Sequence, residues 1–352
     1  MSTPTDPPDI PPFQVQQLIQ SVFEDESGMK PRITCAQALA SEIYVGCSNG
    51  ELIRFALQAD DPNKLESYTI LSRRTLPADK AIDDIVVLPS LSRLLVQSDR
   101  QIHVYTLPSL DPVNVKPIRN VVRFAVDHRH LQRPPIVINE PVDFSVIKRS
   151  GIAMFSLRND RLFYQKEIPL PAGSPPALAA RRIGLALCYA DDEYYNMVDL
   201  DQASLYQLLP LRQSPDPTPF EVKPLITIIV ENEFLILSWT GTSALGLFIT
   251  GEGDPVRGTL TWAGYPKAVC LDYPYITALL PDETIEVHSV ETQATVQVVG
   301  APVEFSVGRL SLVASLHGYL VPSTQRSGKM RKVEVDLLRR DRQDPTTDVQ
   351  SS

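Results

Sequence analysis

The residues best able to carry out chemistry are few, and the histidines show how scattered they are. His128 and His130, in the run VDHRHLQ, have a spacing that suits two ligands of one metal ion, but no third His, Cys or acidic cluster lies near them. A solvated loop is therefore favoured over a metal site for this pair. His103 and His288 occupy similar positions in two strand-like runs, and His317 falls in a predicted turn.

Paired carboxylates, which can act as general acid and base or bind calcium, occur at three places. They are Asp60-Asp61, Asp83-Asp84 and Asp191-Asp192. Each pair falls at a predicted turn or strand start, where Asp side chains bond to the local backbone, so a structural role is favoured. The run GEGDP, from Gly251 to Pro255, is the nearest thing to a phosphate-binding loop and is interpreted as a turn between strands.

The familiar catalytic motifs are missing from the chain. It contains no GxxxxGK[ST], HExxH or GxSxG motif, and no GxGxxG after a strand. The four cysteines, Cys35, Cys47, Cys188 and Cys270, form no CxxC pair and stand in apolar runs. Reduced thiols packed in a cytosolic protein are favoured over a zinc site or a disulfide framework. The sequence thus predicts no enzyme, and no catalytic, cofactor-binding or metal-binding residue.

The composition of the chain disfavours some classes of binding partner. The chain has 33 Lys and Arg against 42 Asp and Glu, a net charge of −9, which disfavours general binding to nucleic acid. An apolar content of 43% excludes disorder along the whole length. No run of about 18 apolar residues is present, so any membrane contact is expected to be peripheral. The basic stretch from Arg326 to Arg342 could face acidic lipid or a partner, although a solvated strand edge is favoured.

A recurring hairpin indicates the scaffold that must position these residues. Clear copies span 42–55, 93–110, 144–157, 184–200 and 275–292, and weaker copies span 234–249 and 312–322. Their turn centres fall near Asn49, Asp99, Arg149, Asp191, Thr240, Asp282 and His317, roughly 35 to 50 residues apart. The 31 prolines, about twice the usual share, fall largely between the runs. A period of about 40 to 50 residues is typical of four-stranded propeller blades.

The repeat predicts an all-β fold, a seven-bladed β-propeller of four-stranded antiparallel blades. Phe13 to Ile19 precedes the first blade and is expected to pair with the last blade, so that N-terminal strand pairing closes the ring. The expected organisation is a disordered lead-in at 1–12, one propeller at 13–338 and a disordered tail at 339–352.

One stretch of the chain, Gly246 to Val299, resembles the citron-homology (CNH) domain at the N-terminus of endolysosomal tethering subunits. These are the vacuolar protein sorting and vacuolar morphogenesis proteins of the CORVET and HOPS complexes, with the animal transforming growth factor-β receptor-associated protein. The resemblance is carried by Gly246, Phe248, Gly251 or Gly253, Trp262, Pro266 and the strand IEVHSVET from Ile285 to Thr292. Runs 33–55 and 81–113 resemble the family's first two blades, and 319–335 is most similar to the fungal CORVET-specific member.

The resemblance implies a non-enzymatic interaction domain that binds a GTP-bound Rab-type small GTPase, with an early-endosomal Rab favoured. It also implies a cytoplasmic protein, peripheral on endosome and vacuole membranes, that helps direct vesicle tethering and fusion without a cofactor. Family members continue into an α-solenoid that binds other tether subunits, and this chain, ending in DRQDPTTDVQSS, is expected to be an N-terminal fragment without it.

Four alternatives stay open. The domain could be a scaffold that contacts other tether subunits or a receptor tail, or it could belong to the late-endosomal HOPS-type subunit. It could also be an enzyme with a site at the central channel, or bind lipid directly through 326–342. No Rab-binding residue can be carried over from the family, so the Rab-binding surface is unknown.

Overall fold

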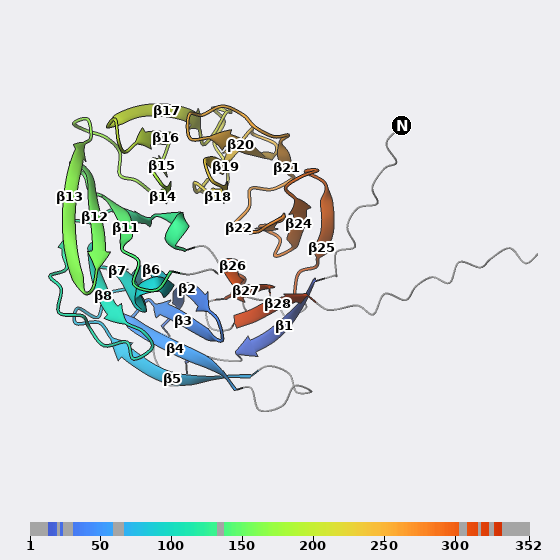
Figure 1. The fold of residues 1–352 in the computed structure, drawn as a ribbon. Helices are drawn as coiled ribbons and strands as arrows, with labels where there is room; N and C mark the ends of the chain where they lie inside the picture. The colour runs from blue at the N-terminus through green and yellow to red at the C-terminus, as the bar shows by residue number, and fades with distance from the viewer. Residues whose placement is uncertain are drawn as a thin grey trace, which may run out of the picture.

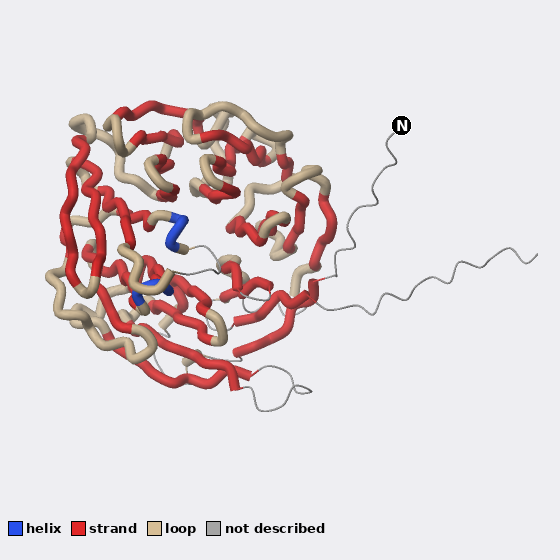
Figure 2. The backbone as a smooth tube through the Cα atoms, in the orientation of Figure 1, coloured by secondary structure: helices blue, strands red, loops and turns tan. Residues whose placement is uncertain are grey.

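Apolar runs separated by turn residues become the strands of a ring of antiparallel sheets (Figure 1). The computed structural model describes residues 13–19, 22–23, 31–58, 67–131, 137–302, 308–315, 318–323 and 327–332. Within these ranges the helical structure is confined to two short 3-10 turns, η1 (Pro89–Leu91) and η2 (His128–His130) (Figure 2). The expectation of an all-β propeller is confirmed.

Six blades are each built from four strands that follow one another in the chain, in the order from the ring's centre outward. Blade 1 has β2 (Ile33–Leu39), β3 (Glu42–Cys47), β4 (Glu51–Gln58) and β5 (Ser67–Thr75), and blade 2 has β6 (Ile82–Leu88), β7 (Arg93–Ser98), β8 (Gln101–Thr106) and β9 (Ile118–Arg119). Blade 3 has β10 (Arg123–Val126), β11 (Val142–Ile147), β12 (Gly151–Arg158) and β13 (Arg161–Pro169), and blade 4 has β14 (Ala179–Ile183), β15 (Ala186–Ala190), β16 (Tyr194–Asp199) and β17 (Ser204–Pro210). Blade 5 has β18 (Ile226–Val230), β19 (Glu233–Trp239), β20 (Ala244–Thr250) and β21 (Leu260–Trp262), and blade 6 has β22 (Ala268–Asp272), β23 (Tyr275–Leu279), β24 (Ile285–Ser289) and β25 (Thr295–Val299).

The remaining sheet joins the two ends of the chain and is called the closing sheet here. Its order is β26 (Val313–Ser315), β27 (Gly318–Pro322), β28 (Ser327–Lys332) and β1 (Phe13–Ile19), with β1 antiparallel to β28. Phe13 is buried against Tyr319, with ring centroids 5.7 Å apart, and the Gln297 side chain bonds to both backbone groups of Phe13. Segments more than 300 residues apart in the sequence therefore lie side by side, as the sequence predicted for 13–19.

The prediction of seven blades was wrong. Six blades of four consecutive strands are present, and the closing sheet is a composite of both termini, not a seventh copy of the repeat. The hairpin predicted at 312–322 joins β26 to β27, the first two strands of that sheet, whereas the other six predicted hairpins join the second and third strands of a blade. The weak signal at 312–322 was matched to the wrong pair of strands because its two short apolar runs are similar in sequence to those of the repeat.

Turn residues explain why the hairpins form where they do. Gly50, in the turn between β3 and β4, has φ of +81°, and an added Cβ would lie 2.9 Å from the Lys80 carbonyl oxygen. Asn49 accepts a hydrogen bond from the Glu51 amide in the same turn. Asp99 and Arg100, between β7 and β8, both have positive φ, as a two-residue hairpin loop requires. These local preferences fix the register of strands that then pack on their neighbours.

The core lies between neighbouring blades and not inside one barrel. One cluster of buried apolar side chains runs from blade 4 through blade 5 into blade 6, and a second joins blades 2 and 3. All seven residues of β19 are buried, which matches its near-continuous apolar sequence FLILSW after Glu233. Because each blade needs its neighbour to cover its faces, the ring is the stable unit.

Candidate functional site

The histidines of the HxH pair do not form a metal site in the part of the chain that the structure describes. His128 and His130 lie in η2, which Asp127 caps by accepting a hydrogen bond from the Arg129 amide. Both residues are partly exposed, so the pair lies in a structured turn of the β10–β11 connection and not in a fully solvated loop. Burial lowers the pKa of His128, and Arg181 lowers it further. Among the described residues no group of three His, Cys, Asp or Glu side chains is arranged to hold a metal ion.

The three acidic pairs differ in where they lie in the fold. Asp191 caps the turn between β15 and β16, accepting hydrogen bonds from the amides of Glu193 and Tyr194, as predicted. Asp83 and Asp84 are the second and third residues of β6, so this pair lies at a strand start, as predicted. The pair Asp60-Asp61 lies outside the described residues.

Inner strands of three blades bring a charged cluster together. Asp83 and Asp84 come from β6, Arg123 from β10 and Arg181 from β14. Burial raises the pKa of Asp84, while Arg181 and Arg123 oppose that rise. Arg123 also donates to the Leu178 carbonyl at 2.8 Å. The two guanidinium groups therefore partly offset the negative charge of the two carboxylates.

The GEGDP run and the cysteines are structural. Thr250 Oγ1 accepts hydrogen bonds from the amides of Glu252 and Asp254, and Ile249 forms a bridge to Pro255, so the run is a closed turn between β20 and β21. All four cysteines are free thiols, two of them buried and two partly buried. Burial raises the pKa of Cys47 to about 12, which leaves its thiol protonated and unreactive at neutral pH.

The residues that carry the family resemblance meet in one packing unit between blades 5 and 6. Trp262 is fully buried and donates from its indole nitrogen to His288 Nε2 at 2.9 Å. Its ring lies against Gly246, where an added Cβ would approach the indole to 2.8 Å. His288 is also buried, and it comes from β24 of the next blade. His288 therefore lies at the boundary between blades 5 and 6, and the motif has a packing role.

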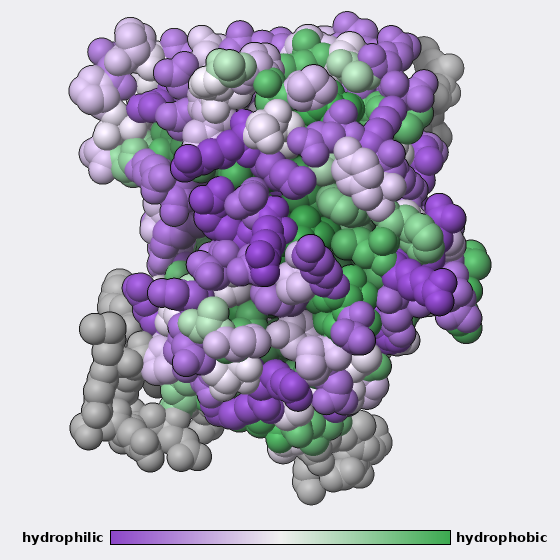
Figure 3. All heavy atoms as spheres, turned by 90° about the vertical axis from the view of Figure 1, so that its left-hand side faces the viewer, coloured by the Kyte–Doolittle hydropathy of each residue, from purple (hydrophilic) through white to green (hydrophobic). Residues whose placement is uncertain are grey.

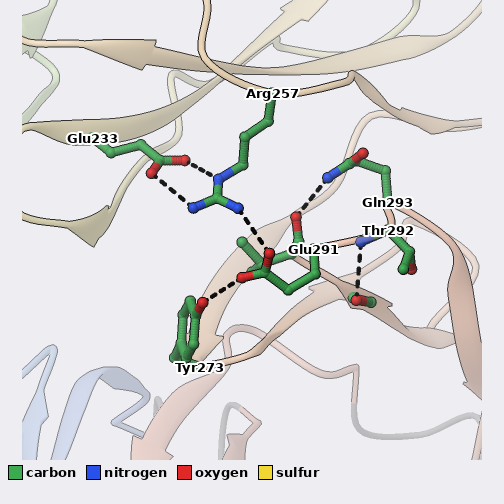
Figure 4. A network of polar contacts seen from close by, with 8 residues as sticks. Glu233, Arg257, Tyr273, Glu291, Thr292 and Gln293 are labelled. Carbon is green, nitrogen blue, oxygen red and sulfur yellow. Dashed lines mark hydrogen bonds and ion pairs between the residues drawn. The ribbon is translucent and has the colours of Figure 1, made fainter. Parts of the chain in front are cut away.

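A polar network beside this unit ties the same two blades together at the surface (Figure 4). Arg257 donates to both carboxylate oxygens of Glu233, at 2.5 and 3.1 Å. Its other nitrogen reaches Glu291 at 3.3 Å, and the Tyr273 hydroxyl donates to the same carboxylate. These contacts lower the pKa of Glu291, the hydrogen bond from Tyr273 being the main cause. Glu291 belongs to the IEVHSVET run, so the end of that motif also joins blades.

Sequence reasoning missed two arginines that hold strands together, the buried Arg182 and the partly exposed Arg257. Arg182 of β14 is 3% exposed and bonds to the Gly184 carbonyl and the Ser145 hydroxyl, while nearby Asp127 accepts from the Gly184 amide. Arg257 was missed because its partner Glu233 lies 24 residues earlier in the chain. A charged residue inside an otherwise apolar run, as in AARRIG, was the available signal for Arg182.

Only part of the basic stretch from Arg326 to Arg342 lies within the described residues. Residues 327–332 form β28, which lies between β27 and β1, so this part is an interior strand and not a solvated edge. The positions from 333 to 342 lie outside the described residues. In the described portion of the chain, no helix has the length and apolar character needed to cross a membrane.

Comparison with known proteins agrees with these observations. A family model described as the VPS3 N-terminal domain matches residues 30–302. Transforming growth factor-beta receptor-associated protein 1 of Bos taurus is 27% identical over 288 residues, which are 81% of this chain and 31% of that protein. Vacuolar protein sorting-associated protein 3 of Saccharomyces cerevisiae is 23% identical over 291 residues, 79% of this chain and 26% of that protein. The chain therefore spans less than a third of the length of these curated relatives.

A solved structure shows the same fold. The AfRom2 CNH domain matches with a TM-score of 0.56 and 16% sequence identity, covering 90% of this chain and 98% of that one. At this level of identity the likeness concerns the fold. Together with the family match, it confirms the resemblance that the sequence showed.

Proposed function

Because the chain belongs to the VPS3 N-terminal domain family, we propose that it is the propeller module of a subunit in vacuolar and endosomal protein sorting. The observation that carries this proposal is the family match over residues 30–302, which includes all six blades. The module is proposed to extend over 13–338. It is proposed to act by binding a partner protein on the cytoplasmic side of endosomes and vacuoles.

The proposed partner is a Rab-type small GTPase in its GTP-bound state. A rigid ring offers preformed loops and strand edges, which is what recognition of a folded protein requires. The switch segments of a small GTPase are ordered by the γ-phosphate, so a rigid surface that fits the ordered form discriminates GTP from GDP. Nothing in this mechanism needs a cofactor or a nucleophile, in keeping with the structural roles of the histidines, cysteines and acidic pairs.

The test is a pull-down with the 352-residue chain against a panel of endosomal and vacuolar Rab proteins, each loaded with a non-hydrolysable GTP analogue or with GDP. GTP-dependent retention of an early-endosomal Rab is expected, and it would support membership of a CORVET-like complex. Preference for a late-endosomal or vacuolar Rab would assign the chain to a HOPS-type subunit instead. Absence of binding to every Rab would contradict the proposed GTPase partner.

A further inference from the structure

A groove runs along the outer rim of the ring between blades 2 and 3. It has a volume of about 540 Å³, and its two walls are the segment 114–118, which leads into β9, and the start of β13 at 160–163. Phe155 of β12 lies in the groove between these walls. β9 is only two residues long, and the irregular segment before it forms one wall of the groove.

The lining is apolar and continues onto the surface. Val115, Pro117 and Leu162 line the groove, and all three are partly exposed. Tyr164 packs edge-on against Phe155, with ring centroids 5.7 Å apart, and is 57% exposed. Figure 3 faces the side on which β8 and β13 lie, and it shows hydrophobic surface flanked by hydrophilic surface. An exposed apolar groove with a polar rim is typical of a binding site for another protein.

The rim of the groove carries unpaired positive charge. Asp160 is bound by Arg93 through two hydrogen bonds, at 2.6 and 2.8 Å, so its negative charge is already neutralised. Lys116 and Arg161, in contrast, are exposed and form no ion pair with any residue that the structure describes. In a chain of net charge −9, two free cations beside one apolar groove favour an acidic ligand.

The adjoining strand also has free backbone groups. β13, nine residues long, is the outermost strand of blade 3, and no described strand pairs with its outer edge. Such an edge can accept an extended peptide as an added strand, with the backbone giving affinity and the side-chain pockets giving specificity.

We propose that this groove binds an extended peptide segment of a partner protein, in which a large apolar side chain is flanked by acidic residues. The apolar side chain packs on Phe155, Leu162 and Pro117, and the carboxylates face Lys116 and Arg161. The peptide backbone pairs with the free edge of β13. This proposal does not depend on the proposed binding of a GTPase.

The test is selection of peptides from a phage-displayed library of random 12-residue sequences on the immobilised 352-residue chain, followed by affinity measurements on the enriched peptides. We expect enrichment of acidic sequences with one or two large apolar residues. Their affinity should fall at least about tenfold in the double variant Lys116→Glu/Arg161→Glu, and also in Val115→Glu, which places a negative charge on the apolar lining. The affinity should also weaken as salt rises, since the rim contacts are exposed.

A matched control separates this site from general charge attraction. Lys80→Glu/Arg149→Glu makes the same change in net charge at two other exposed positions and should leave peptide binding unchanged. Circular dichroism of each variant shows whether the ring has folded. No enrichment, enrichment of peptides without acidic residues, or equal loss of binding in the control pair would each overturn the proposal.

Discussion

At the scale of single residues, the positions that mark the family are explained by packing. Gly246 makes room for the Trp262 ring, and the Trp262 indole donates to His288 across the boundary between blades 5 and 6. The sequence revealed these residues as a pattern, but their mutual contact could not be predicted, since Trp262 and His288 are 26 residues apart. Motif residues of this kind maintain the ring and do not report where a partner binds.

The close approach of Gly246 and Trp262 gives the first prediction. Gly246→Ala forces the fully buried indole to move, so the free energy of unfolding should fall by about 1 to 3 kcal/mol. Gly300→Ala is the control, because an added Cβ there meets no atom within 4 Å. Urea denaturation of the three proteins measures the difference. Equal losses in the two variants would show that the Trp262 contact is not the cause.

His288 gives a prediction about pH. Burial lowers its pKa, and Glu286 partly opposes the change. A histidine with a lowered folded-state pKa binds more protons when unfolded, so its contribution is fully present well above the unfolded value of about 6.5 and is lost as pH falls through that value. The free energy of unfolding should therefore decrease from pH 7.5 to 5.5, by less than about 1.4 kcal/mol per pH unit for this one group.

The variant His288→Gln isolates that share of the pH dependence. The Gln amide oxygen can still accept a hydrogen bond from Trp262, but it does not titrate. The burial of His103 and His128 lowers their pKa values too, so the variant should keep a reduced slope and not a flat one. Identical slopes for the two proteins in denaturation at pH 5.5 to 7.5 would contradict the assignment.

At the scale of elements, blades are held together by a few charged contacts as well as by apolar packing. Arg257 precedes β21 and spans Glu233 of β19 and Glu291 after β24 (Figure 4). The two acids are not equivalent, because Glu233 is 7% exposed whereas Glu291 is exposed to solvent. A buried carboxylate that loses its only ion pair is costly, and an exposed one is not.

This difference predicts the outcome of two substitutions. Arg257→Met keeps much of the side-chain volume but leaves Glu233 without its ion pair, which should cost about 2 to 3 kcal/mol of stability. Glu291→Gln should have little effect on the same urea denaturation curve. A larger loss for Glu291→Gln than for Arg257→Met would show that the surface contact, and not the Glu233 pair, joins the blades.

At the scale of the whole molecule, the ring depends on the pairing of its two ends. Phe13, Leu18 and Ile19 of β1 are buried, and each such side chain contributes about 1.5 to 3 kcal/mol, or roughly 5 to 9 kcal/mol together. That sum is comparable with the total stability of about 5 to 15 kcal/mol that a folded protein typically has. Removal of β1 should therefore unfold the ring and not only fray it.

Two truncations test the closing sheet. Deletion of 1–12 leaves β1 intact and should leave the melting temperature unchanged. Deletion of 1–19 removes β1 and is expected to give an aggregating or unfolded protein in circular dichroism and size-exclusion chromatography. A stable monomer after the longer deletion would contradict the role of β1 in closing the ring.

The sequence was sufficient for most of the fold but not for its closure or its surfaces. Local signals, such as Asn49-Gly50 and the apolar runs around it, correctly located six hairpins because turn chemistry acts over neighbouring residues. The closing sheet was misassigned as a seventh blade, since its strands come from both termini and its predicted hairpin joins the first two strands of the sheet. The groove between blades 2 and 3 could not be predicted, because residues far apart in sequence form its walls.

The most direct measurement of the proposed function is calorimetric titration of this chain with the Rab that binds best in the panel, loaded with a GTP analogue and then with GDP. A dissociation constant at least about tenfold tighter for the GTP form is expected, which corresponds to about 1.4 kcal/mol. Equal affinities for the two forms, or no heat of binding with either, would contradict the assignment of this propeller as a module that recognises an active small GTPase.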